Sequence, residues 1–514
     1  MNELFYEVLD DCYTRYGLAV LLVRNKLRSL DEIASEEQLS KLLIETLEHC
    51  ASHFRMKTAN DPEIDDKLIF ENISNELLDE NSKLVQSSGM ADKGLFLFPS
   101  ALIIEEKSAK HSYNPNQKIR QELSQNKSLR LSNIVSKGVN LRTIKVNGGG
   151  SLSSPSSTLL YAACSAITAM TPMKPAFYDY EKSKNCAIIP DLPLDKMIVF
   201  VELFNRMQTS SVNLMVATVR RNEKKDDKNK MKVKFQRPLI HHGNYPNAPK
   251  YPKLLGGVGL IASIGLWAQQ NEMTKNGNEV LKSLENVSLY LVAADGTSEE
   301  HFKNPIIKLA YSGELANIIR SLSFTARKIS TIENDQLLFI FHASRFMQQF
   351  NQTYFKSFLS IRAEYEHWLL PLIKEYFMTT ENISKELVLS ATALGKWLNS
   401  ICYFAAKNKL GKASFDEIAK EKNKYIAELE STIMASKSSI DLASRISTRG
   451  GRMAHSDMPV EVLPFLQASA WGEIEHKVAQ QLVISFMRVR GEVSNNKDSN
   501  KEEKQTELIQ NELK

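Results

Sequence analysis

Cysteine is scarce in this sequence, with five residues among 514, at positions 12, 50, 164, 186 and 402. No two of them stand at CxxC spacing, so the sequence predicts neither a zinc ribbon nor a thioredoxin-like redox site. Single scattered cysteines are typical of buried, reduced thiols in a cytoplasmic protein.

No apolar run is long enough to cross a membrane. The longest, residues 254–268, has 15 residues, whereas a spanning helix needs about 20. Its four glycines favour a buried helix that packs closely against a sheet. The start, Met1-Asn2-Glu3-Leu4, lacks the basic segment and cleavage site of a signal peptide. We therefore expect a cytoplasmic protein with no membrane partner.

Motifs for cofactors and catalysis are also missing. The three glycines at 148–150 are followed by Ser151-Leu152 instead of the GK[ST] that closes a phosphate-binding P-loop. His241 and His242 have no carboxylate or cysteine at metal-ligand spacing. We expect no cofactor, no metal, no catalytic residue and no enzymatic activity.

The length of 514 residues predicts two or three domains, and 43% hydrophobic and 24% charged residues are normal for a globular protein. We expect an α+β protein with four parts. These are an N-terminal mixed α/β region (1–185), a core block (186–314), an all-α C-terminal helical bundle (315–493) and a disordered charged tail (494–514). Apolar residues recur at helical spacing in five stretches of the bundle, which predicts helices over 337–358, 364–377, 385–407, 415–434 and 460–490.

The core block predicts a ferredoxin-like order, βαββαβ. Apolar, strand-like runs lie at 187–189, 212–219, 231–235 and 287–293, and helix-like runs lie at 194–207 and 254–270. RNA-recognition domains also use this order. A further pair of connecting strands is expected near 306–311.

A basic segment at 220–237 is the strongest nucleic-acid candidate. It has nine cations and three anions, a net charge of about +6, and phosphate contacts by such cations add affinity through counterion release. A solvated hairpin tip is the alternative. The binding residues proposed here are Arg220, Arg221, Lys230, Lys232, Lys234 and Arg237.

Three further stretches are candidates. In the glycine-rich loop, Gly148, Gly149 and Gly150 allow backbone to approach a base edge or phosphate beside Lys145 and Asn147, and a flexible linker is the alternative. Asn244 and Tyr245 lie in a proline-rich stretch that predicts a rigid, exposed loop. Arg445, Arg449 and Arg452 stand at helical spacing and suit a phosphate backbone, with a solvated helix end as the alternative.

Several of these stretches resemble the large subunit of type I CRISPR interference complexes (Cascade), nearest to its I-A/I-B branch. The similar residues are Ile188-Ile189-Pro190-Asp191-Leu192, Gly243-Asn244-Tyr245 and Leu254-Leu255-Gly256-Gly257. The order of a mixed α/β body and a helical bundle is also similar.

The resemblance implies a non-catalytic subunit that reads the protospacer-adjacent motif on duplex DNA, helps to unwind it and stabilises the R-loop. The implied partners are guide RNA, double-stranded target DNA, the backbone, handle-binding and small subunits of Cascade, and a helicase-nuclease recruited in trans. The alternatives are a nucleic-acid-processing enzyme and a protein-interaction scaffold without nucleic acid.

Overall fold

The chain divides into two units, Met1–Phe302 and Lys303–Lys514. The computed structural model describes residues 2–52, 56–58, 67–68, 70–72, 84–87, 102–105, 114–125, 128–130, 158–179, 184–209, 217–225, 231–236, 243–293, 296–453 and 457–491. The boundary after residue 302 lies close to the one expected at 314. Residues 186–302 belong to the same unit as the N-terminal region, so the expected separation at 185 is not a boundary between units.

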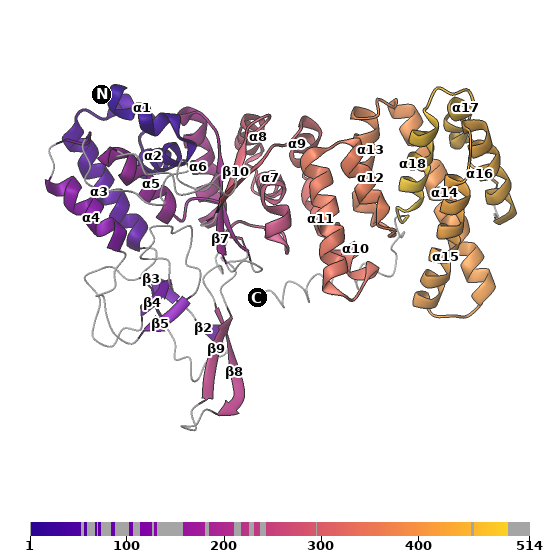
Figure 1. Ribbon diagram of the computed structural model, residues 1–514, viewed down its shortest axis with the longest axis horizontal. Coiled ribbons are helices and arrows are strands. Elements are labelled where there is room, and N and C mark those ends of the chain that lie inside the picture. The colour runs from indigo at the N-terminus through magenta and orange to yellow at the C-terminus, as the bar shows by residue number, and fades with distance from the viewer. Residues whose placement is uncertain are drawn as a thin grey trace. The chain divides into compact units, whose positions relative to one another are not determined.

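The first unit mixes helices and strands (Figure 1). Its helices are α1 (Asn2–Asp10), α2 (Cys12–Arg24), α3 (Glu36–Ser52), α4 (Asn114–Gln125), α5 (Leu159–Met170), α6 (Leu194–Thr209), α7 (Pro252–Gln270) and α8 (Thr274–Ser283). Its strands are β1 (Met56–Thr58), β2 (Lys67–Leu68), β3 (Phe70–Asn72), β4 (Leu84–Ser87), β5 (Leu102–Glu105), β6 (Ala176–Asp179), β7 (Lys184–Pro190), β8 (Ala217–Lys225), β9 (Met231–Gln236), β10 (Leu289–Ala293) and β11 (Gly296–Glu300).

Helix α2 is the central helix of this unit, because it packs against both α5 and α6. The Asp11 carboxylate accepts from the Tyr13 N–H and so caps the helix start. Gly17 permits a close crossing with α5, since a β-carbon there would stand 2.0 Å from the Cys164 carbonyl oxygen. The Thr168 hydroxyl donates to the Tyr13 carbonyl at 2.6 Å, so hydrogen bonds as well as packing fix this crossing.

Strands β6, β7, β10 and β11 form an antiparallel sheet in the order β11-β10-β7-β6. Helix α7 packs against β6 and β10. A β-carbon at Gly256 would lie 2.8 Å from the Phe177 ring, and one at Gly257 would lie 2.2 Å from the Glu300 carboxylate. The glycine-rich run is therefore a buried helix close to a sheet, as its composition predicted. None of the described helices is long and apolar enough to cross a membrane.

In a ferredoxin-like core, the arrangement expected for residues 186–314, the first strand pairs with both the fourth and the third. Strands β7 and β10 do pair, and so do β8 and β9, but β6 rather than β9 lies on the other side of β7, and β8 pairs with β2 in a separate sheet. The apolar runs of β7 and β10 can be buried on both faces, whereas β8 and β9 contain several Arg and Lys residues that a central position would force out of water. A third sheet has the order β3-β1-β4-β5.

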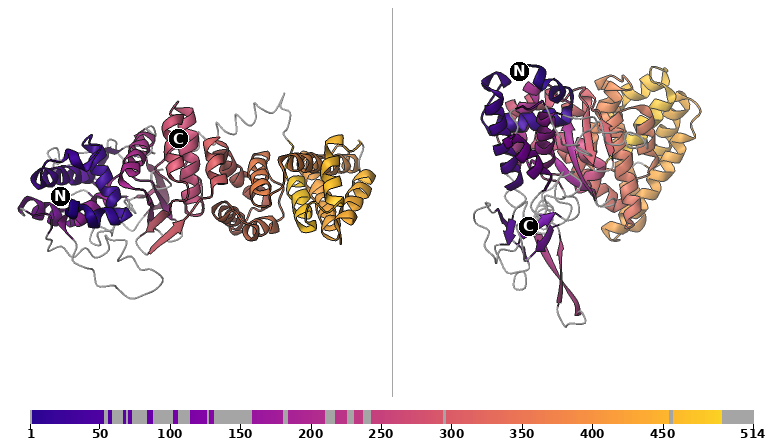
Figure 2. Two further views of the ribbon diagram at one scale, coloured as in Figure 1. Left: turned by 90° about the horizontal axis from the view of Figure 1, so that it is seen from above. Right: turned by 60° about the vertical axis from the view of Figure 1, so that its left-hand side comes forward.

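The second unit is built from helices. They are α9 (Asn304–Tyr311), α10 (Glu314–Ile329), α11 (Glu333–Gln349), α12 (Gln352–Ser360), α13 (Leu370–Thr379), α14 (Lys385–Leu410), α15 (Phe415–Met434), α16 (Ser439–Met453), α17 (Leu463–Ala470) and α18 (His476–Met487). Figure 2 shows these helices from two further directions. The strands expected near 306–311 are wrong: this stretch is α9, which has a proline in its first turn, where no intrahelical N–H is needed.

A buried ion pair ties the last helix of this unit to α15. The Arg488 guanidinium donates to both carboxylate oxygens of Glu430, at 2.6 and 3.1 Å, and both side chains are about 95% buried. Arg488 also donates to the Leu359 carbonyl at 2.7 Å and to the Tyr365 hydroxyl at 3.2 Å. Burial alone would lower the pKa of Arg488, but Tyr365 and Glu430 raise it above its ordinary value. Arg488 is therefore charged in the folded protein.

Candidate nucleic-acid interface

The paired strands β8 and β9 hold most of the basic segment. In their register Arg220 lies directly opposite Lys234, and Arg221 lies opposite Val233. Like charges at directly opposed positions destabilise a ladder, so this pair of strands would gain stability from an anion at that position. Lys232 stands two positions before Lys234 in β9. Lys230 and Arg237 lie outside the described residues.

The three arginines proposed near the C-terminus lie on α16, where they share one face. Arg445 forms an ion pair with Asp441 at 2.8 Å, and Arg449 forms one with Glu428 of α15 at 2.7 Å. Arg452 is exposed, and no ion-pair partner lies beside it among the described residues. Two of the three cations are thus already neutralised, which weakens this face as a phosphate site.

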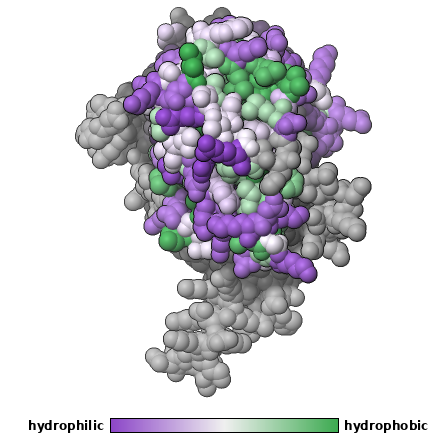
Figure 3. All heavy atoms as spheres, turned by 90° about the vertical axis from the view of Figure 1, so that its right-hand side faces the viewer, coloured by the Kyte–Doolittle hydropathy of each residue, from purple (hydrophilic) through white to green (hydrophobic). Residues whose placement is uncertain are grey.

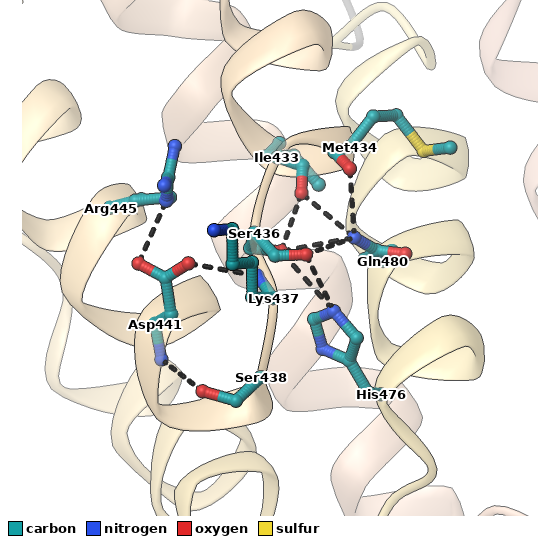
Figure 4. Close-up of polar contacts among 9 residues, drawn as sticks. All are labelled: Ile433, Met434, Ser436, Lys437, Ser438, Asp441, Arg445, His476 and Gln480. Atoms are coloured by element: carbon teal, nitrogen blue, oxygen red, sulfur yellow. Dashed lines mark hydrogen bonds and ion pairs between the residues drawn. The ribbon is translucent and has the colours of Figure 1, made fainter.

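The turn between α15 and α16, which places this face, is held by α18 (Figure 4). The Gln480 amide donates to the Ile433 carbonyl at 2.9 Å and to the Ser436 hydroxyl at 3.0 Å. The His476 ring nitrogen Nε2 lies 3.0 Å from the Ser436 carbonyl oxygen. Asp441 accepts from the Lys437 N–H at 2.8 Å, so it serves both the turn and Arg445. The pKa of Asp441 is lowered by these hydrogen bonds, chiefly the one from Arg445.

Asn244 and Tyr245 do not lie on the surface, so the predicted exposed loop is wrong at these two positions. Both are buried. Asn244 exchanges hydrogen bonds with Ala176, accepting from its N–H at 2.9 Å through the side chain and donating to its carbonyl at 3.1 Å through the backbone. Its amide also donates to the Lys174 carbonyl at 2.8 Å. The residue therefore joins its loop to the start of β6, a structural role.

Tyr245 packs beneath α7. Its hydroxyl lies 3.5 Å from the Gly256 carbonyl oxygen. Burial, with a smaller contribution from Glu300, raises the pKa of Tyr245 well above its ordinary value. The ring is therefore neutral and out of reach of a base or phosphate.

The glycine-rich loop lies outside the described residues, together with Lys145 and Asn147. It stays a prediction from sequence. The five cysteines are all buried, and no disulfide joins any two of them. Burial is the main reason that the pKa of Cys50 is raised to about 11, so that thiol is protonated near neutral pH. Among the described residues, no group of three or more His, Cys, Asp or Glu side chains is arranged to hold a metal ion.

The sequence analysis missed a set of basic residues on α14. Lys385, Lys396 and Lys407 are all exposed. They are spaced eleven residues apart, which is about three turns of an α-helix, so they lie nearly in line. The sequence signal for this line is the repeat of eleven residues, or three helical turns, between successive lysines. Figure 3 shows one face of the molecule, on which hydrophilic residues predominate and apolar residues form smaller groups.

Comparison with known proteins supplies the family. The model of the family CRISPR-associated protein Csp2 matches residues 11–490, which is most of the chain and includes parts of both units. No curated protein and no solved structure matches the chain significantly. The chain belongs to the CRISPR-associated protein Csp2 family.

Proposed function

We propose that this CRISPR-associated protein is the non-catalytic large subunit of a type I (A/B-like) Cascade complex. In this role it recognises the protospacer-adjacent motif, helps to open the target duplex and stabilises the R-loop, while a separate helicase-nuclease cuts the DNA. Its partners are the guide RNA, the target DNA and the other Cascade subunits. Family membership supports the CRISPR setting, and the sequence resemblance supports the choice of subunit.

The observation that favours nucleic-acid binding is the register of β8 and β9. Arg220 and Lys234 are directly opposed across the two strands, and Lys232 stands two positions from Lys234 in β9. A phosphate between such residues turns cross-strand repulsion into two attractive contacts. Because phosphates are the same in every sequence, this surface contributes affinity, and motif reading belongs to other residues.

The test is the salt dependence of duplex binding by the assembled complex. The variant Arg220→Ala/Lys234→Ala removes two phosphate contacts, and each contact contributes about 0.9 to the slope of log K against log salt. We expect the slope to fall by about 1.8. The matched control is Lys356→Ala/Lys477→Ala, which removes two exposed lysines from the second unit. Equal slopes in the two variants contradict a role for the hairpin in binding.

A further inference from the structure

Helix α14 has a line of three exposed lysines, Lys385, Lys396 and Lys407. Successive members are separated by about 16 Å along the helix axis and by a drift of about 20° around it. None of the three has an ion-pair partner among the described residues. By contrast, Lys409 on the same helix pairs with Glu421 at 2.5 Å. The line is therefore a row of unneutralised positive charge.

A fourth lysine strengthens the charge near the start of the line. Lys374 of α13 is half-buried, and burial lowers its pKa. The charges of Lys396 and Lys385 lower it further, and Glu314 opposes them. Glu386 is the only acidic residue within α14. Lys374 is thus repelled by two lysines of α14, and an anion bound there would relieve that repulsion.

Exposed apolar side chains lie beside the lysine line. Phe404 is 46% exposed and lies about 60–80° around the helix from Lys396 and Lys407, and Leu389, 47% exposed, lies within about 40° of the line. The Tyr403 ring packs edge-on against Phe404, with centroids 5.6 Å apart. An exposed aromatic ring beside a row of cations is the pattern of sites that stack unpaired bases and track the backbone. A duplex offers its phosphates but keeps its base faces stacked inside, so Phe404 favours a single strand.

We infer that the α14 line, defined as Lys385, Lys396, Phe404 and Lys407, binds a single-stranded nucleic acid. The lysines contact its phosphates and Phe404 stacks on an unpaired base. The inference rests on the proposed function only in taking a nucleic acid as the ligand. It adds a second contact surface, in a different unit from the β8–β9 hairpin.

The experiment measures binding of the purified full-length chain to a labelled oligothymidylate of about 16 nucleotides across a salt series. The charge variant replaces Lys385, Lys396 and Lys407 with Gln, which keeps helix propensity nearly unchanged. Each single-strand phosphate contact contributes about 0.7 to the salt slope, so we expect the slope to fall by about 2. The same oligonucleotide in RNA form and as a duplex shows whether the line distinguishes the sugar or requires an unpaired strand.

Two comparisons separate this surface from general positive charge. The control variant replaces three other exposed lysines of the second unit with Gln, namely Lys356, Lys437 and Lys477. Its binding should show the same dependence on salt as that of the wild-type chain. Phe404→Ala should weaken binding on the order of tenfold without changing the slope, because stacking does not release counterions. A thermal melt of each variant verifies folding.

Three results overturn the inference. The first is an equal slope for the charge variant and the control. The second is a wild-type chain that fails to bind the single strand although the assembled complex shows hairpin-dependent binding to duplex DNA, which leaves the proposed function intact. The third is stronger competition by polyglutamate than by oligothymidylate at equal charge, which identifies an acidic protein as the occupant of the α14 line.

Discussion

Removal of one partner of the buried pair Arg488–Glu430 should strongly destabilise the second unit. Arg488→Met keeps most of the side-chain volume but leaves the Glu430 carboxylate about 94% buried without its two charged hydrogen bonds. It also removes the donor to the Leu359 carbonyl. Loss of one partner of a buried ion pair costs about 3–5 kcal/mol, because the remaining charge stays out of water.

Urea unfolding followed by tryptophan fluorescence measures this cost. Three of the four tryptophans lie in the second unit, and a Trp267→Phe background removes the signal of the first. With an m-value of about 2 kcal/mol/M, the midpoint should fall by about 2 M urea. The double variant Arg488→Met/Glu430→Met should recover most of the loss, because no unpaired charge remains.

The surface pair Arg449–Glu428 is the matched control. Its side chains are 43% and 52% exposed, and such pairs contribute about 0–1 kcal/mol. Arg449→Met should therefore barely shift the midpoint. The reasoning is refuted if Arg488→Met and Arg449→Met lower the urea midpoint equally, because burial would then have no effect on how much an ion pair contributes to stability.

Three further predictions concern other parts of the chain. Burial lowers the pKa of Lys174 to about 7, so above that pH the folded state binds fewer protons than the unfolded state. The urea midpoint of the first unit, read at Trp267, should therefore rise from about pH 7 to about pH 8, below the range in which thiols titrate in the unfolded chain, and Lys174→Met should abolish this rise. Replacement of Lys230, Lys232 and Lys234 with Ala should weaken DNA binding equally for all sequences and flatten its salt slope, and unchanged binding would identify a solvated tip. Residues 303–491, expressed alone, should give a helical circular dichroism spectrum and a cooperative melt, and a gradual melt would disprove independent folding.

Local patterns in the sequence predicted several of the long helices, but they misassigned α9 and did not establish the strand pairing. The helix predicted at 415–434 has the bounds of α15, because its apolar residues recur at helical spacing and Ser414 with Glu417 forms a capping box. Strands β7 and β10 are about a hundred residues apart. An apolar run shows that a strand is buried but not which strand it pairs with.

The same limit explains the errors at the candidate site. Asn244 stands among prolines and a glycine, a composition typical of an exposed loop, yet its partner Ala176 is 68 residues away in sequence. The arginines of α16 were correctly placed on one helix face, but Glu428 comes from another helix, so the neutralisation of Arg449 was not evident from sequence. The lysine line of α14 can be predicted from the sequence, because a repeat of eleven residues in a helix places side chains on one face.

The most direct test of the proposed function compares target binding by the Cascade complex assembled with and without this chain. Each complex, loaded with one guide RNA, is offered a matched target as a duplex and as a single strand. We predict that omission of the chain abolishes binding to the duplex and spares binding to the single strand, since guide pairing alone needs no motif recognition or unwinding. Equal binding of the duplex by both complexes would contradict the proposal that this protein recognises and opens target DNA.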